Sequence, residues 1–138
     1  MDEMRFDTKV AILVRDDLPA WQELNVTAFL ASGIASDPEL IGEPYRDADG
    51  TTYLPMLRQP ILVFSADAAT IATARARAVE RGMRVAVYTA QLFSTGHDAA
   101  NREAVAAVAA ADLDLVGAGI HGPRNAVDRI TKPARLHP

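Results

Sequence analysis

The sequence contains no cysteine among its 138 residues. A disulfide framework, a zinc site built on thiolates and a cysteine nucleophile are therefore excluded. If the chain forms a covalent intermediate, its nucleophile has to be a serine, threonine, lysine, aspartate or histidine. The absence of cysteine also fits a reducing compartment, so we predict a cytoplasmic location.

Long apolar runs and a large excess of one charge are also missing. No stretch approaches the roughly 20 apolar residues that cross a bilayer, and residues 1–9 mix acids and bases where a secretory signal would be apolar. Fourteen Lys and Arg face 18 Asp and Glu, and the net charge of −4 disfavours broad binding to nucleic acid. We expect no membrane contact and a single domain over residues 1–138.

Apolar strand patterns alternate with helical patterns along the chain. Branched apolar runs predict four buried strands, at residues 10–14, 60–64, 83–89 and 113–120. Helical patterns follow them at 19–33, 68–81, 99–111 and from 123 onward. Residues 36–59, between the first helix and the second strand, are polar and are predicted to form a surface excursion that contains a hairpin. The alternation predicts an α/β fold with a mixed, largely parallel four-stranded sheet and helices on both faces.

Several residues are expected to define these helices. In the first helix the apolar positions Trp21, Leu24, Ala28 and Ala31 recur at helical spacing, and Gly33 is expected to end it. In the second helix we expect Asp67 to cap the N-terminus and Gly82 to follow the last turn in the left-handed conformation.

Residues 119–131 read Gly-Ile-His-Gly-Pro-Arg-Asn-Ala-Val-Asp-Arg-Ile-Thr. This stretch resembles the closing motif of a bacterial family, number two thousand among the domains of unknown function. Other pieces agree with the same family: Arg15-Asp16-Asp17, Leu24-Asn25, Leu40-Ile41-Gly42 and Asp47-Ala48-Asp49-Gly50. The family is similar in fold to type II peptidyl-tRNA hydrolases, whose last helix also follows a Gly-Pro. The resemblance implies a type II peptidyl-tRNA hydrolase-like fold and a homodimer.

The residues that carry activity in those hydrolases are not all matched. The hydrolases begin their first helix with a Lys- and Gly-rich loop, which is absent from residues 19–28 here. If the chain is an enzyme, the resemblance implies a divergent hydrolase that acts on an aminoacyl or acyl ester-like substrate. A partner tRNA would meet the basic residues near the C-terminus, which are Arg124, Arg129, Lys132, Arg135 and His137.

Two histidines give the candidate catalytic set. His97 and His121 follow the third and fourth predicted strands, where polar site residues tend to collect, so they could face each other. A histidine can act as a base or acid near neutral pH, with Asp98 or Asp128 as its orienting carboxylate. Thr95 or Thr131 would be its hydroxyl partner, and Asn25 is expected as a pocket residue. The alternative is that Asp98 and Thr95 cap a helix and the histidines are ordinary surface residues. No spacing typical of a metal site accompanies them, so we predict neither a metal nor a cofactor.

A second candidate site is expected near the start of the last helix. Residues 117–122 match the pattern G-x-G-x-x-G, but a dinucleotide fold also needs a later strand with an acid, so we expect close packing of a strand against a helix instead. The helix start favours a simple anion site. Its predicted residues are Arg15, Asp16, Gly122, Arg124, Asp128 and Thr131. The alternative function is therefore a non-catalytic protein that binds a small molecule or anion, or that forms an oligomer.

Overall fold

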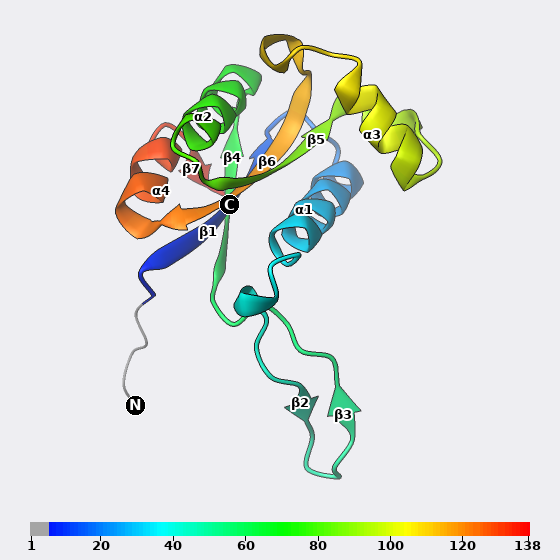
Figure 1. Ribbon diagram of the computed structural model, residues 1–138, viewed down its shortest axis with the longest axis vertical. Helices are drawn as coiled ribbons and strands as arrows, with labels where there is room; N and C mark the ends of the chain where they lie inside the picture. Colours follow the sequence, from blue (N-terminus) through cyan, green and yellow to red (C-terminus); the bar gives the residue numbers. More distant parts are fainter. Residues whose placement is uncertain (1–5) are drawn as a thin grey trace.

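The computed structural model describes residues 6–138. Residues 1–5, which form most of the segment that argued against a secretory signal, lie outside this range. A five-stranded sheet in the order β5-β6-β1-β4-β7 forms the centre of the structure (Figure 1). Its strands are β1 Thr8–Arg15, β4 Ile61–Ala66, β5 Arg84–Thr89, β6 Leu115–Pro123 and β7 Arg135–Leu136. The prediction of four strands missed β7, because two residues in a polar tail carry no strand pattern.

The sheet is mixed, as predicted, but the prediction that it is largely parallel is wrong. Only β1 and β4 run parallel, whereas the pairs β1–β6, β5–β6 and β4–β7 are antiparallel. The connection from β1 to β4 contains α1, as parallel neighbours require. The connection from β5 to β6 also contains a helix although those strands are antiparallel neighbours, so the alternation of elements did not determine strand direction.

Helices cover both faces of the sheet. Their bounds are α1 Ala20–Ile34, α2 Ala68–Glu80, α3 Asp98–Ala106 and α4 Arg124–Thr131. Helix α1 packs on one face over β1, β5 and β6, whereas α2 and α4 pack on the other face and against each other. In β1, Ala11 and Leu13 face the α2 and α4 side while Ile12 and Val14 face α1. The apolar run of β1 is therefore buried on both faces, as predicted.

Local end signals were confirmed at α2 but not at α1. The Asp67 carboxylate accepts a hydrogen bond from the Thr70 amide at 2.8 Å, and Gly82 has φ of +70° after the last turn. Gly33, by contrast, lies inside α1, which continues to Ile34. A Cβ at Gly33 would lie 2.9 Å from the Ala86 Cβ, so this glycine lets α1 approach β5.

Two glycines of β6 also set the position of α1. A Cβ at Gly117 would lie 2.7 Å from Val26 Cγ1 and 2.9 Å from Leu30 Cδ1. A Cβ at Gly119 would lie 3.4 Å from Ile34 Cγ1, which is ordinary contact. The prediction that the glycine pattern serves the packing of a strand against a helix is confirmed.

The remaining elements are short. The excursion before β4 contains the predicted hairpin, made of β2 Tyr45–Arg46 and β3 Thr52–Tyr53, which projects from the sheet in Figure 1. Residues 6–138 also contain three 3-10 helices: η1 Pro38–Leu40, η2 Ala90–Ser94 and η3 Ala110–Asp112. Among the helices of residues 6–138, none is long and apolar enough to span a membrane.

Candidate functional site

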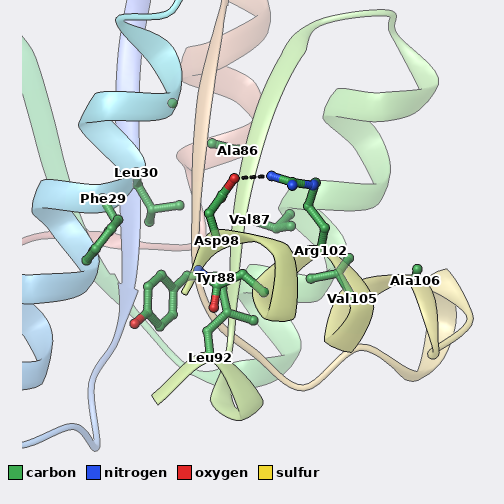
Figure 2. Close-up of a pocket in the computed structure, with 12 residues that line it drawn as sticks. Phe29, Leu30, Ala86, Val87, Tyr88, Leu92, Asp98, Arg102, Val105 and Ala106 are labelled. Carbon is green, nitrogen blue, oxygen red and sulfur yellow. Dashed lines mark hydrogen bonds and ion pairs between the residues drawn. The ribbon is translucent and has the colours of Figure 1, made fainter. Parts of the chain in front are cut away.

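A cleft of about 470 Å³ lies between α1 and α3, next to the edge strand β5. We call it the α1–α3 cleft; its lining residues are Phe29, Leu30, Gly33, Ala86, Val87, Tyr88, Leu92, Asp98, Asn101, Arg102, Val105 and Ala106. Figure 2 shows Phe29 and Leu30 on one side, Val105 on the other, and Tyr88 and Leu92 between them. The walls are therefore mainly apolar, with polar side chains contributed by α3.

The cleft exists because α3 stands away from the sheet. None of the nine residues of α3 is buried, and its main packing contacts are with η2 rather than with a strand. Strand β5 is the last strand of the sheet on this side, so no further strand fills the space beside it. An apolar surface that a packed helix would normally cover is left accessible.

Polar side chains gather at one end of the cleft. A second hollow of about 400 Å³ shares Phe29, Tyr88, Leu92, Asp98 and Asn101 with the first, so the two adjoin. We call it the polar end; its further lining residues are Trp21, Asn25, Phe93, Thr95, Gly96 and His97.

Aromatic rings form the wall of the polar end. The ring centroids of Tyr88 lie 5.8 Å from Phe29 and 5.2 Å from Phe93, and Trp21 meets Phe93 edge-on at 6.1 Å. These separations lie in the range of favourable aromatic contacts. Burial raises the pKa of the Tyr88 hydroxyl above its ordinary value, so this side chain stays uncharged at neutral pH.

The structure brings three of the four predicted catalytic residues together and separates the fourth. Asn25, His97 and Asp98 all line the polar end. His121 pairs with Arg84 at the start of β5, whereas His97 follows the far end of that strand. The intervening strand spans about 17 Å. The expectation that the two histidines face each other is wrong, because antiparallel β5 and β6 have their carboxyl ends at opposite edges of the sheet.

His97 is a helix cap. Its Nδ1 accepts a hydrogen bond from the Ala100 amide at 3.2 Å, so His97 caps the N-terminus of α3. The alternative prediction, in which Asp98 and Thr95 cap this helix, is wrong on this point. A neutral imidazole that accepts at Nδ1 carries its proton on Nε2. His97 therefore offers a hydrogen-bond donor at the polar end rather than a free base.

The other polar groups of this end are also engaged. Asp98 forms an ion pair with Arg102, drawn as a dashed line in Figure 2. The Thr95 hydroxyl is hydrogen bonded to Asn101 Oδ1 and lies 3.0 Å from the Leu92 carbonyl oxygen. The carboxylate and the hydroxyl are thus occupied, whereas no side-chain hydrogen bond of Asn25 occurs within the described chain.

His121 lies in a polar hollow of about 370 Å³ near the start of β1 and the end of β6. This hollow is also lined by Asp37, Arg58 and Gln59. Burial lowers the pKa of His121 below its ordinary 6.5, and the nearby Arg84 lowers it further while Asp37 opposes both. The imidazole Nε2 is buried and has no hydrogen-bond partner within residues 6–138. Burial and Arg84 therefore favour the neutral form of His121.

The lowered pKa of His121 predicts a pH dependence of stability. Well above pH 6.5 His121 is neutral in both the folded and the unfolded state. As the pH falls through 6.5 the unfolded chain takes up the proton first, so folding stability falls until the folded chain is also protonated. We expect the urea midpoint to fall less between about pH 7.5 and 5.5 in His121→Asn than in the unchanged protein. His97→Asn is the control, because asparagine keeps a capping side chain. An identical pH slope in His121→Asn and the unchanged protein would contradict the assignment.

The predicted anion-binding residues do not form one site. Arg15 and Asp16 lie at the end of β1, whereas Gly122, Arg124 and Asp128 lie beside its start and Thr131 ends α4. Most already have partners within the described chain: Arg15 binds Asp17 at 2.6 Å and Asp114 at 3.1 Å, Arg124 Nε donates to the Phe6 carbonyl at 3.0 Å, Asp128 pairs with Lys9, and the Thr131 hydroxyl donates to the Val127 carbonyl at 3.0 Å. The hydrogen bond from Arg15 to Asp17 raises the pKa of the guanidinium.

The remaining member of that set, Gly122, has a packing role. A Cβ at this position would lie 2.8 Å from Met83 Cγ, so the glycine accommodates a core side chain. No group of three or more His, Asp or Glu residues within residues 6–138 is placed to hold a metal ion.

Sequence reasoning missed the aromatic and apolar lining of the cleft. The usable signal was the position of the aromatics on α1: Phe29 and Trp21 lie off the stripe of Val26, Leu30 and Ile34 that α1 buries. Large apolar side chains off the buried stripe of a helix indicate an exposed apolar surface.

Comparisons with known proteins place the chain in a family without assigning a reaction. A solved structure of Atu0240, a protein of unknown function from Agrobacterium tumefaciens strain C58, is 46% identical, with a TM-score of 0.92 over 97% of this chain and 100% of that one. A comparison with curated proteins finds no match. A family model described as protein of unknown function (DUF2000) matches residues 8–138. The chain belongs to the DUF2000 family.

Proposed function

We propose that this protein binds a small molecule with an apolar body and a hydrogen-bonding head in the α1–α3 cleft. The observation that carries the proposal is a cleft with mainly apolar walls that adjoins a hollow where amide and imidazole groups gather. Its volume of about 470 Å³ lies in the range of small-molecule sites, which combine apolar walls with a few polar groups.

The polar end favours a ligand head that accepts hydrogen bonds. The Asn25 side-chain amide can donate and accept hydrogen bonds, and His97, whose Nδ1 caps α3, can donate one through Nε2. An apolar or aromatic body would then lie against Phe29, Tyr88 and Leu92. An acyl or aminoacyl group with a carbonyl oxygen in its head satisfies both requirements, and it agrees with the ester-like substrate class that the resemblance implies.

Binding without turnover is better supported than hydrolysis. A hydrolase needs a base that can take a proton from water or from a nucleophile. At the polar end, the His97 nitrogen that could accept is used by the helix cap, and Asp98 is paired with Arg102. The resemblance to peptidyl-tRNA hydrolases remains a prediction and supplies the second arm of the test.

The test uses N-acetyl-L-phenylalanine methyl ester as the probe, followed by amide shifts in an NMR titration of the full chain. We expect saturable shifts confined to α1, β5, η2 and α3, with no methanol released. Release of methanol, or hydrolysis of peptidyl-tRNA by the same sample, would instead establish an enzyme. No saturable shift at any soluble concentration of the probe would overturn the proposal for this ligand class.

A charge placed in the cleft is expected to weaken this binding. Val105 lies half-buried in the cleft wall on α3, so Val105→Glu puts a carboxylate among apolar side chains and should weaken probe binding at least tenfold. Val79→Glu is the matched control, because Val79 is a 53% exposed helical valine on the opposite face of the sheet. Equal affinity in the two variants would place the ligand elsewhere. Circular dichroism checks that both variants remain folded.

A further inference from the structure

Another hollow lies on the face of the sheet opposite the α1–α3 cleft, between α2 and α4, which lie side by side in Figure 1. It has a volume of about 460 Å³ and is lined by Arg77, Glu80, Arg81, Arg129 and Ile130. We call it the arginine hollow. Arg129 lies about fifty residues from Arg77 and Arg81 in the sequence, so only the fold brings it beside them.

The charge of the arginine hollow is opposite to that of the chain. The whole sequence has a net charge of −4, whereas this hollow combines three guanidinium groups with one carboxylate. None of the three arginines forms an ion pair with any carboxylate of residues 6–138, and this holds for the neighbouring Glu80 as well. Arg77 and Arg81 are also one helical turn apart, a spacing at which like charges repel each other. An anion in the hollow would relieve that repulsion.

Helix dipoles alone do not account for this arrangement. Arg77 and Arg129 lie in the last turns of α2 and α4, where a cation is favourable. That effect is satisfied by one cation at each helix end and does not require both ends to open onto a shared hollow. The convergence of the third arginine, Arg81, on the same space is the feature that a ligand would explain.

We propose that the arginine hollow binds the phosphate group of a small phosphorylated molecule. Guanidinium groups match phosphate oxygens in paired, charge-assisted hydrogen bonds. A phosphate fills only part of 460 Å³, so the remaining space holds the carbon skeleton against Ile130, and Glu80 can accept a hydrogen bond from a ligand hydroxyl. A carboxylate in the lining disfavours a nucleic-acid backbone, which presents only negative charge along its length.

Isothermal titration of the full chain tests the proposal with ribose 5-phosphate, inorganic phosphate and ribose in chloride buffer of physiological ionic strength. We expect saturable one-to-one binding of ribose 5-phosphate, weaker binding of inorganic phosphate and none of ribose. The double variant Arg81→Gln with Arg129→Gln should weaken ribose 5-phosphate binding at least tenfold. Both side chains are exposed, so the variant should remain folded and keep its affinity for the probe of the α1–α3 cleft.

The control variant is Arg46→Gln, which removes an exposed arginine from the hairpin. If Arg46→Gln weakens binding as much as the double variant does, the attraction is general electrostatics and the proposal fails. Binding of a short RNA without binding of ribose 5-phosphate would overturn it in favour of a nucleic-acid surface. Absence of binding by both phosphates would overturn it outright.

Discussion

Gly117→Val is expected to remove more than about 3 kcal/mol of folding stability, although valine is the better strand residue. The first added atom already lies 2.7 Å from Val26 Cγ1 and 3.1 Å from the Leu13 carbonyl oxygen. The backbone of a buried central strand cannot move aside, so α1 would have to shift away from the sheet. Urea unfolding followed by circular dichroism measures the loss.

The control for this prediction is two residues away on the same strand and face. Gly117→Ala should cost about 1–3 kcal/mol, whereas Gly119→Ala should be nearly neutral, because its Cβ meets Ile34 Cγ1 only at 3.4 Å. Equal losses in the two alanine variants would mean that the cost arises from the glycine backbone and not from the contact with α1.

The strands of the core were predictable because a buried strand has a recognisable sequence pattern. A strand covered on both faces needs an uninterrupted apolar run, and residues 10–14 supply one. Strand direction has no corresponding sequence pattern. The same apolar run at β6 suits a parallel or an antiparallel neighbour, so the three antiparallel pairs could be found only from the fold.

The helical pattern of α1 predicted a helix but the wrong buried face. Trp21 and Leu24 are 62% and 72% exposed, while α1 buries Val26, Leu30 and Ile34. Both sets recur at helical spacing, and an alanine-rich, apolar helix offers more than one such stripe. The choice between them depends on glycines at the contact, because a Cβ at Gly117 of β6 or at Gly33 of α1 would keep α1 away from the sheet.

The candidate site was predictable in part, for a reason that lies in strand direction. Strands β1 and β5 are both antiparallel to β6, so they run the same way and their carboxyl ends share one edge of the sheet. The early residues of α1 and the cap of α3 follow those ends, which is why Asn25 and His97 meet. His121 lies within β6, near its carboxyl end, and that end is at the opposite edge of the sheet.

The arginine hollow was not predictable from sequence. Arg77 lies on the exposed side of α2, Arg81 directly follows that helix, and Arg129 lies in α4. The sequence around each arginine is typical of a solvated helix surface. Their meeting requires the contact between α2 and α4, which no periodicity encodes.

Ile12→Ala should cost about 3–4 kcal/mol, while Ile61→Ala should cost less than about 1 kcal/mol. Both side chains belong to the face of the sheet that carries α1, on the adjacent strands β1 and β4. Ile12 is fully buried beneath α1, but Ile61 is 37% exposed, because α1 covers β1, β5 and β6 and leaves β4 partly open. Truncation of Ile12 therefore leaves a buried cavity, whereas the space left by truncation of Ile61 is filled by solvent water. The two losses are compared by urea unfolding.

The same pair of variants tests the expected homodimer. The open part of the face around β4 continues into a shallow groove lined by Tyr45, Met56 and Leu57 at the base of the hairpin. If a second copy covers this face, Ile61→Ala should be costly at high protein concentration and the cost should shrink on dilution, because a dimer contributes stability by mass action. A small cost at every concentration would leave the face of β4 solvated, and a homodimer would then have to form through another surface.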